Sequence, residues 1–527
     1  MVGQNSINTV QDVHYVGGIG EWLRFHDRQH PEDDAVVFGD RRLSFAALNR
    51  RVNQVANALA ECGIEKGERV ALLLLNSNAF VETFFACAKL GAIAVPLNYR
   101  LSPAEIGFIL GDSGARVIVY HPRFAELFRP IRGETVLKHG IAVTGDDESP
   151  EAGDADYERV LAASPDSDPE TLVEQLDPLM MMYTSGTTGK PKGALLTHSN
   201  PTWITHNTQL SPLALIDGDS VLTVAPLFHI GGLAIHTLPC MHLGRKVILH
   251  GVFDPVETLR TIERERVSVL FLLPAMWQAV MQVPDFGSYD LSSLRYLVSG
   301  GSPCPIPVIE FFQSRGLPFL EGFGMTETTA SACVLGNEDA VRKNGSVGKP
   351  LTHVQMRIVD DEDRDVAPGE TGELVLRGPS MFREYWNRPD ATEESCRNGW
   401  FHSGDLARQD EEGFYYIVDR KKDMLISGGE NVYPTEVEQV LYRHPKVQEI
   451  AVIGVPDERW GEVPMALVVP PAGEHLTLEE LQDFCRDKLA RFKTPKHLAE
   501  LSELPRTATG KVLKRELRQQ YTESAKQ

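Results

Sequence analysis

Basic side chains are scarce in this sequence relative to acidic ones. Its 527 residues hold 52 lysines and arginines against 73 aspartates and glutamates, so the formal net charge is −21. Such an excess disfavours non-specific binding to nucleic acids and to anionic lipid. The one obvious basic cluster, KVLKRELR at 511–518, is more typical of a solvated helix face. We therefore expect no nucleic-acid partner.

Long apolar runs are also missing. No run reaches the length of a membrane-spanning helix, which predicts no integral membrane association. The first residues lack a basic region followed by an apolar stretch, and the terminal SAKQ is not a peroxisomal address. Both observations favour a cytoplasmic location.

Cysteines are few and stand singly. The seven thiols include no CxxC pair, which argues against disulfides and zinc sites and for reduced thiols in a cytoplasm. Each is expected to be a small core residue.

The chain is too long for one ordinary domain, and its first part alternates between helical and strand patterns. In the stretch 42–70, apolar residues recur at helical spacing, namely Leu48, Val52, Val55, Ala56 and Leu59. Buried strands are then predicted at 70–77, 93–98 and 115–121, with helices at 80–92 and 104–114. This rhythm predicts an α/β fold with a mostly parallel sheet and right-handed crossovers. Residues 146–177 are acidic and poor in apolar side chains, which predicts a surface excursion.

The composition changes after Asp419. Short strands are predicted at 448–457 and 465–471, and a helix at 477–490 with Thr477 as N-cap and Glu480 completing a capping box. The charged DRKKD at 419–423 has no apolar face and is either a plain linker or a hinge. We predict two domains, 1–419 and 420–527.

Residues 183–193, YTSGTTGKPKG, combine three glycines, four serine or threonine hydroxyls and two lysines after a buried strand. Backbone N–H groups that glycine leaves accessible, together with hydroxyls and ammonium groups, suit a polyphosphate. The spacing is not that of a Walker A motif, because Thr184 stands where the first glycine is required and Pro191 follows Lys190. A flexible surface loop is the alternative interpretation of this stretch taken alone.

Seven stretches, in order, resemble the motifs of the adenylate-forming superfamily, which includes acyl-CoA synthetases, luciferases and the adenylation domains of peptide synthetases. They are YTSGTTGKPKG (183–193), PLFHIGG (226–232), SGGSP (299–303), EGFGMTETT (321–329), WFHSGD (400–405), DRKKDMLISGGENVYPTEVE (419–438) and PRTATGKVLKREL (505–517). The resemblance implies a large N-terminal domain of parallel and mixed β-sheets with helices, followed by a small mobile α+β domain.

The resemblance also implies a two-step reaction. A carboxylate attacks the α-phosphorus of ATP to give an acyl-adenylate and pyrophosphate, and a thiol then displaces AMP to give a thioester. Because an anion approaches a polyanion, positioned cations should dominate catalysis, and Mg²⁺ bridging the phosphates is expected. The implied small molecules are ATP, Mg²⁺, coenzyme A and a carboxylic acid, and a homodimer stays open.

Residue roles follow from the resemblance, position by position. The phosphate loop would consist of Thr184, Ser185, Gly186, Thr187, Thr188, Gly189 and Lys190. Thr184 and Glu327 would hold Mg²⁺, and Thr326 would touch the α-phosphate. The adenine and ribose would be bound by Gly301, Ser302, Pro303, Glu321, Gly322, Phe323, Gly324, Asp405 and Arg420. His229 would form a gate or wall at the acyl carboxylate.

Lys511 would be the catalytic cation of the first step. It must withdraw before a pantetheine arm can reach the acyl carbon, and the family achieves this by rotation about a hinge residue, here Lys422. Gly428 and Gly429 would then line the pantetheine tunnel.

Several of these residues have plainer interpretations. Glu327 is also a normal carboxylate for a first helical turn, Phe323 a normal core aromatic, and Asp405 a normal turn aspartate after a glycine. A lysine near a terminus, such as Lys511, is ordinarily solvated. A satisfied structural role remains open for His229.

The substrate acid is only partly defined by the sequence. The stretch PLFHIGGLAIH contains no acidic residue to pair with an α-ammonium group, which disfavours amino acids. Gly231, Gly232 and Gly300 favour an apolar pocket for a fatty, branched or aromatic acid. No carrier-protein domain follows, so free coenzyme A is the expected acceptor. The alternatives are transfer to a separate carrier protein and a nucleotide-binding sensor without turnover.

Overall fold

The computed structural model describes residues 17–145, 148–184, 191–506 and 512–524, which form two compact units. The large unit comprises Met1–Gln355 and Arg377–Glu394, and the small unit comprises Met356–Leu376 and Ser395–Gln527. The small unit thus takes in a segment well before position 419. The domain boundary expected between residues 419 and 420 stays a prediction.

An eight-stranded sheet of the large unit contains the strands predicted between residues 70 and 121. Its order is β19-β9-β8-β4-β3-β5-β6-β7. The strands are β3 (Arg69–Leu73), β4 (Ile93–Pro96), β5 (Val117–Tyr120), β6 (His139–Ala142), β7 (Ala155–Asp156), β8 (Pro178–Thr184), β9 (Lys192–Thr197) and β19 (Glu384–Tyr385). The pairs β4–β3, β3–β5 and β5–β6 are parallel, which confirms the predicted rhythm, whereas β8–β9 and β9–β19 are antiparallel.

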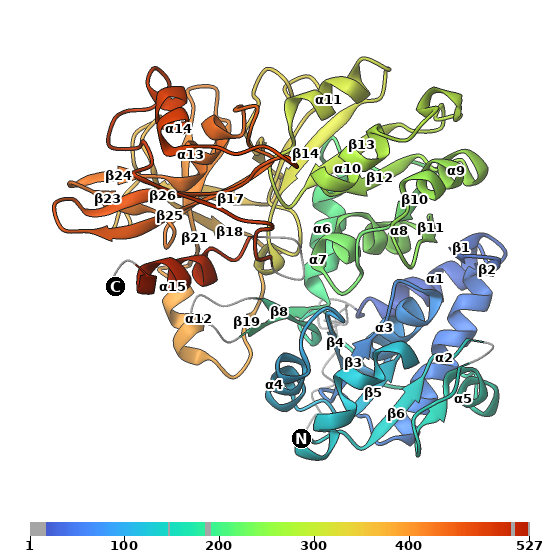
Figure 1. The fold of residues 1–527 in the computed structure, drawn as a ribbon. Coiled ribbons are helices and arrows are strands. Elements are labelled where there is room, and N and C mark those ends of the chain that lie inside the picture. Colours follow the sequence, from blue (N-terminus) through green and yellow to red (C-terminus); the bar gives the residue numbers. More distant parts are fainter. Residues whose placement is uncertain (1–16, 146–147, 185–190, 507–511, 525–527) are drawn as a thin grey trace, which may run out of the picture. The chain divides into compact units, whose positions relative to one another are not determined.

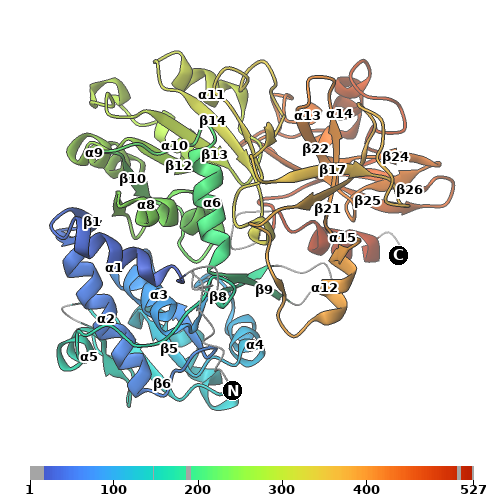
Figure 2. The ribbon, with the colours of Figure 1, turned by 180° about the vertical axis from the view of Figure 1, so that it is seen from behind.

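Three helices connect and flank these strands as the sequence predicts. They are α2 (Phe45–Glu61), α3 (Asn78–Leu90) and α4 (Pro103–Ser113). The crossovers β3–α3–β4 and β4–α4–β5 run in opposite directions across the sheet, so right-handed connections place α3 and α4 on opposite faces, as both views show (Figures 1 and 2). The five apolar residues picked out in α2 are all buried.

Local sequence explains where these helices begin and end. The hydroxyls of Ser44, Ser77 and Ser102 each accept a hydrogen bond from the backbone N–H three residues later. Helices α3 and α4 end at Gly91 and Gly114, which adopt left-handed conformations with φ of 65° and 66°.

A nine-stranded sheet forms the rest of the large unit's core, in the order β16-β15-β14-β13-β12-β10-β11-β1-β2. Its strands are β1 (Asp34–Phe38), β2 (Arg41–Ser44), β10 (Ser220–Thr223), β11 (Lys246–Leu249), β12 (Val269–Leu272), β13 (Tyr296–Gly300), β14 (Phe319–Phe323), β15 (Cys333–Leu335) and β16 (Lys349–Pro350). The run from β1 to β14 is parallel. Ligands of such sheets bind at the carboxyl ends of the strands.

Further helices cover the sheets of the large unit. They are α1 (Gly20–Gln29), α5 (Tyr157–Ala163), α6 (Ser199–Gln209), α7 (Ile230–Gly232), α8 (Leu238–Leu243), α9 (Pro255–Glu265), α10 (Pro274–Met281), α11 (Ile306–Gln313) and α12 (Pro389–Ser395). Short 3₁₀ turns are η2 (Pro122–Leu127), η3 (Arg129–Glu134), η5 (Phe286–Ser288) and η6 (Thr326–Thr328), and η4 (Leu233–Thr237) is a π turn. In the part of the chain that the structure describes, no helix is long and apolar enough to cross a membrane.

The small unit contains two five-stranded sheets. One has the order β17-β18-β21-β20 with β22 beside β21, and the other the order β24-β23-β26-β25 with β27 beside β26. The strands are β17 (Gln355–Val359), β18 (Gly372–Arg377), β20 (Cys396–Arg397), β21 (Trp400–Gln409), β22 (Tyr415–Arg420), β23 (Leu425–Ser427), β24 (Glu430–Val432), β25 (Glu449–Asp457), β26 (Gly461–Val469) and β27 (His497–Glu500). The helices are α13 (Pro434–Leu441), α14 (Leu478–Cys485) and α15 (Lys514–Ser524). The capping box predicted at Thr477 and Glu480 is confirmed at the start of α14.

One prediction made from composition is confirmed and one is wrong. The acidic segment 146–177 does lie at the surface, since most of its described residues are exposed or half-buried, although it contains α5 and its Asp168 carboxylate pairs with the buried ammonium of Lys89 at 2.5 Å. Its charges complement cations of the unit rather than facing only water. All seven cysteines are free, as expected, but Cys396 is exposed and Cys62 is half-buried, so these two are not core residues.

Candidate active site

The phosphate-loop motif lies between two antiparallel strands. Strand β8 ends at Thr184 and β9 begins at Lys192, and these two residues face each other in the register (Figure 2). The Thr184 hydroxyl lies 3.5 Å from the Lys192 carbonyl oxygen. Residues 185–190, which include six of the seven predicted loop residues, lie outside the described part of the chain. The strand that follows the motif, β9, differs from the helix that follows a Walker A motif.

Glu327 lies in the 3₁₀ turn η6 and is buried, with 8% of its surface exposed. Its Oε1 accepts a hydrogen bond of 2.7 Å from the hydroxyl of Tyr385 on β19, and its carbonyl oxygen accepts one of 2.8 Å from Phe382. The turn closes with Thr329 and Ala330 at positive φ values of 56° and 77°. Non-glycine residues in this conformation cost free energy and gather at functional sites.

The two residues predicted to hold Mg²⁺ come from one neighbourhood of the large unit. Strand β19 pairs with β9 at Tyr385 and Ala194, and β9 pairs with β8, which ends at Thr184. The turn η6 that carries Glu327 also contacts β9. Tyr385 was missed by the sequence reasoning, because it lies in none of the motifs.

The adenine segments lie side by side at the carboxyl ends of two parallel strands. In the register of β13 and β14, Ser299 faces Glu321 and Gly300 faces Gly322. Beyond them the chain turns at Gly301, whose φ is 83°, and exposes Ser302 and Pro303. Phe323 ends β14 and is half-buried, so it is not the plain core aromatic of the alternative interpretation. Gly324 is required here, because a Cβ at this position would lie 2.0 Å from the Ala330 carbonyl oxygen.

Glu321 is a buried carboxyl group at this edge. Its Oε2 accepts a hydrogen bond of 3.1 Å from the backbone N–H of Cys304. Burial raises the pKa of Glu321 to about 7, and the Cys304 N–H only partly opposes that shift. The side chain therefore titrates near neutral pH.

His229 caps the short helix α7 after β10. Its Nδ1 accepts a hydrogen bond of 3.2 Å from the backbone N–H of Gly231, and the residue is exposed rather than buried in the core. Gly232 packs so tightly that a Cβ there would lie 2.3 Å from the Pro226 carbonyl oxygen. Cβ atoms built at Gly231 and Gly300 would each lie 3.4 Å from the ring of Phe271, so this ring sits between the two predicted pocket glycines. The sequence reasoning did not identify Phe271.

The ribose motif lies in the small unit. Asp405 and Arg420 face each other in the register of β21 and β22, and their side chains form an ion pair with an Nε to Oδ1 distance of 2.6 Å. Asp405 is only 3% exposed, so it is a buried strand residue and not the turn aspartate of the alternative interpretation. The Ser403 hydroxyl accepts a hydrogen bond of 3.0 Å from the backbone N–H of Asp405.

The hinge motif begins in the last two residues of β22, Asp419 and Arg420. The Asp419 carboxylate is buried and accepts hydrogen bonds from the backbone of Arg420 at 2.7 Å and of Thr435 at 2.8 Å. The ammonium of Lys421 pairs with Asp361 at 2.9 Å and with Glu373 at 3.2 Å. These contacts hold the residues just before the predicted hinge, Lys422, whose pKa is lowered by burial.

Gly428 and Gly429 form the turn between β23 and β24. Their φ values are 61° and 89°, which glycine tolerates best. A Cβ at Gly428 would lie 2.7 Å from Cε3 of Trp460. Lys511, the predicted catalytic residue, lies outside the described part of the chain. Near it, Arg506 and Val512 form an isolated antiparallel bridge, and Arg518 of α15 pairs with Asp423 at 2.6 Å.

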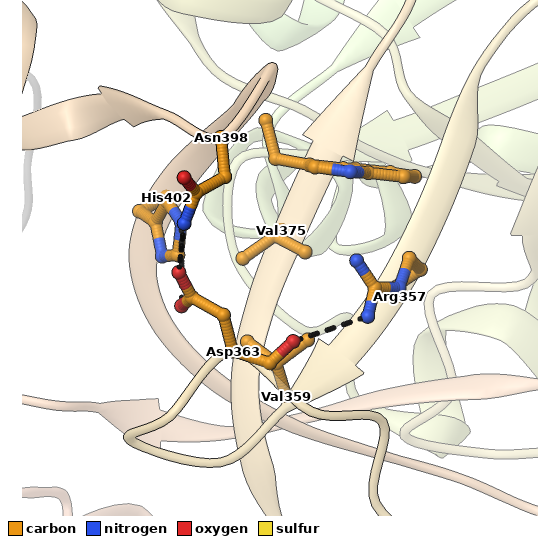
Figure 3. Close-up of a pocket in the computed structure, with 7 residues that line it drawn as sticks. Arg357, Val359, Asp363, Val375, Asn398 and His402 are labelled. Carbon is orange, nitrogen blue, oxygen red and sulfur yellow. Dashed lines mark hydrogen bonds and ion pairs between the residues drawn. The ribbon is translucent and has the colours of Figure 1, made fainter.

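An open pocket of about 180 Å³ lies beside the ribose strand in the small unit (Figure 3). On one side, Asn398 donates a hydrogen bond of 2.7 Å to Asp363, and His402 lies 3.7 Å from the same carboxylate. On the other side, the Arg357 guanidinium lies 5.0 Å from the centroid of the Trp400 ring. The charges of this pocket are already paired within the unit, so it adds no reactive group to the site.

The described residues fit the small molecules that the motifs imply. Glu327 receives a neutral hydroxyl rather than a cation from the described residues, which leaves a buried carboxylate suited to a divalent metal ion. Asp405 offers acceptor oxygens in a buried position, as ribose hydroxyls require. Glycine is needed at Gly301 for a left-handed turn and at Gly324 for the close approach of the Ala330 carbonyl oxygen, and both shape the backbone beside which a purine would lie.

Comparison with known proteins gives the same picture over the whole chain. Residues 23–386 match the family described as AMP-binding enzyme, and residues 436–511 match the AMP-binding enzyme C-terminal domain. A feruloyl-CoA synthase of an Amycolatopsis species is 43% identical over 96% of this chain and 99% of its own. An indoleacetate–CoA ligase of Aromatoleum aromaticum is 40% identical over 95% and 98%. The structure of o-succinylbenzoate coenzyme A synthetase from Bacillus subtilis with ATP and a magnesium ion matches with a TM-score of 0.84 and 33% identity, over 94% of this chain and 98% of that one.

Proposed function

The chain belongs to the family of AMP-binding enzymes, and on that premise we propose that it ligates a carboxylic acid to coenzyme A through an acyl-adenylate. ATP is cleaved to AMP and pyrophosphate in the process. The observation that carries the proposal is the edge formed by β13 and β14, where the two adenine motifs meet and continue into the turn that holds Glu327.

In the first step the acid's carboxylate attacks the α-phosphorus, and pyrophosphate leaves. We assign the adenine to Gly301–Pro303 and Glu321–Gly324, the α-phosphate to Thr326, and the terminal phosphates to residues 184–190. Thr184 and Glu327 hold Mg²⁺, which neutralises charge on the phosphates when it is bound. Lys511 brings an ammonium to the same reacting groups.

In the second step the thiol of coenzyme A attacks the acyl carbon, and AMP leaves. Asp405 and Arg420 retain the ribose, and the turn at Gly428 and Gly429 borders the path of the pantetheine arm. The pantetheine arm can reach the acyl carbon only after Lys511 has withdrawn. The domain that begins at residue 420 therefore turns about Lys422. The contacts of Lys421 with Asp361 and Glu373 give that hinge a fixed base.

We assign the binding of the substrate acid to the segment that begins at His229. An aromatic acid is favoured over an amino acid, because PLFHIGGLAIH holds no carboxylate and because the relatives named above are feruloyl-CoA and indoleacetate–CoA ligases. We also propose a cytoplasmic place for the enzyme, which its seven free cysteines support. A homodimer is compatible with the proposal, which does not depend on it.

The test is a panel of carboxylic acids, assayed for pyrophosphate release and for thioester formation with and without coenzyme A. We expect pyrophosphate release that depends on the acid, and an acyl-CoA product. Release without any thioester would instead favour transfer to a carrier protein, and ATP binding without release for any acid would favour a nucleotide sensor.

A further inference from the structure

A small cavity lies beside the carboxylate motif in the large unit. It is lined by Thr223 of β10, the glycines Gly231 and Gly232, Phe271 of β12, and His236 and Thr237 of the π turn η4. Its volume is about 10 Å³, which is room for a single water-sized group. The glycines and Phe271 are shared with the wall that we assign to the acid, so the cavity adjoins the acyl site.

The hydrogen bonds around His236 define which of its nitrogens carries the proton. The side chain is fully buried, and burial lowers the pKa of His236 to about 3, so the ring is neutral at pH 7. The Tyr296 hydroxyl donates its only hydrogen to the Leu213 carbonyl oxygen at 2.5 Å, and its oxygen lies 3.2 Å from His236 Nε2. Nε2 must therefore carry the hydrogen and donate to Tyr296. It follows that Nδ1 of His236 is an acceptor.

This acceptor is buried without a partner among the described residues. A buried acceptor without a hydrogen bond is destabilising, and such groups in native proteins call for an explanation. His236 lines the cavity, so a donor group held there is a candidate for the missing partner.

The two threonines of the cavity also present acceptors. The Thr237 hydroxyl donates to the Gly232 carbonyl oxygen at 2.8 Å, so in its contact of 2.8 Å with Thr223 it must accept. The Thr223 hydroxyl therefore donates its hydrogen to Thr237. Neither hydroxyl has a hydrogen left for a guest, and the polar side chains that line the cavity offer lone pairs only.

We propose that this cavity receives one hydrogen-bond donor, a hydroxyl or N–H group at the distal edge of an aromatic substrate acid, and that His236 recognises it. The inference rests on the proposed function and defines its substrate class more narrowly. Phe271 supplies an aromatic wall against which such a ring packs, between the backbones of Gly231 and Gly300.

The test compares cinnamic acids that differ only at the distal ring carbon. Hydroxyl and amino substituents are donors, whereas methyl and fluorine bracket the hydroxyl in size and donate nothing. We expect kcat/KM for acyl-CoA formation to be at least about tenfold higher with the donors, since a site built to bond a hydroxyl rejects an analogue without it. Equal kcat/KM values for all four acids would overturn the inference, because a water molecule would then be the occupant.

The variant His236→Leu removes the acceptor while keeping a similar volume. It should reduce to about one the ratio of kcat/KM with the hydroxyl- or amino-substituted acids to kcat/KM with the methyl-substituted acid. The matched control is His242→Leu, which removes a half-buried imidazole of the same unit, stacked on Trp22 with a centroid distance of 4.1 Å. We expect the control to keep the ratio of the unmodified enzyme. A donor preference that survives in His236→Leu would also overturn the inference.

Failure of the inference is distinguishable from failure of the proposed function. If all four acids yield thioesters at equal rates, the ligase function stands and the inference falls. If no acid in this series or in the broader panel supports pyrophosphate release, the proposed function itself fails. Should His236→Leu not fold, the comparison of acids with the unmodified enzyme still decides the point.

Discussion

The hydroxyl of Tyr385 donates to Oε1 of Glu327 across 2.7 Å, although 58 residues separate them in the chain. Both side chains are buried, so water competes little for this hydrogen bond. The bond holds in one orientation the carboxylate that we assign to Mg²⁺. Side chains that hydrogen-bond to a metal-binding carboxylate in this way commonly tune its affinity for the metal.

Replacing Tyr385 by Phe should therefore weaken adenylation through the metal. A hydrogen bond to a charged group contributes about 1.5–3 kcal/mol, so we expect kcat/KM to fall about ten- to a hundredfold and the half-saturating Mg²⁺ concentration to rise. Acid-dependent pyrophosphate exchange over a Mg²⁺ titration measures both quantities. The control Tyr415→Phe removes a buried hydroxyl that donates to the Met356 carbonyl oxygen at 3.0 Å, and should leave the titration unchanged. An unchanged titration in Tyr385→Phe would contradict this role.

Local sequence was sufficient to predict the βαβ part of the fold but not the contacts across it. Helix α2 follows from the spacing of its apolar residues, and α14 from the capping box of Thr477 and Glu480. Tyr385 and Phe271 have no comparable signal, because their roles depend on strand pairings that join distant segments. Motif order singled out Glu327 and Asp405, and the burial of Asp405 in a strand excludes its alternative interpretation as a turn aspartate.

The pKa of Glu321 gives stability a dependence on pH. Because burial raises it from 4.5 to about 7, the folded protein holds this proton more tightly than the unfolded chain. The corresponding stabilisation is complete below about pH 4.5 and is lost as pH rises through 7, a change of about 3 kcal/mol. The variant Glu321→Gln, which can still accept from Cys304, removes this term. Its stability relative to the unmodified protein should therefore increase between pH 5 and pH 8.

Urea unfolding of both proteins at the two pH values measures this difference. The exposed carboxylate variant Glu411→Gln serves as the control and should show no comparable trend. If the difference between Glu321→Gln and the unmodified protein is the same at pH 5 and pH 8, Glu321 does not titrate in this range.

Phe271 should limit the length of the acids that the enzyme accepts. Its ring lies against the backbones of Gly231 and Gly300, so a smaller side chain would deepen the acyl site between them. We expect Phe271→Leu to raise the kcat/KM ratio of acids one or two carbons longer to their parent acids by about tenfold. Chromatographic quantification of the acyl-CoA products gives this ratio. The matched control for lost packing is Phe319→Leu, which removes a core ring whose centroid lies 5.5 Å from that of Trp277. This control should leave the kcat/KM ratio of longer to parent acids unchanged.

Lys511 should separate the two half-reactions. Its ammonium is needed where the carboxylate meets the α-phosphate, whereas thiol attack on the acyl carbon requires it to be elsewhere. We expect Lys511→Ala to lower acid-dependent pyrophosphate release by at least about a hundredfold, as loss of a group that stabilises transition-state charge does. Thioester formation from supplied acyl-AMP and coenzyme A should stay within about twofold of the unmodified enzyme.

Rapid-quench assays of each half-reaction measure the two rates separately. The control Lys488→Ala removes an exposed lysine of the same unit and should leave both rates unchanged. Equal losses in both half-reactions of Lys511→Ala would contradict the hinge at Lys422, because the same ammonium would then have to act in both steps. Loss of thioester formation alone would reassign Lys511 to coenzyme A binding.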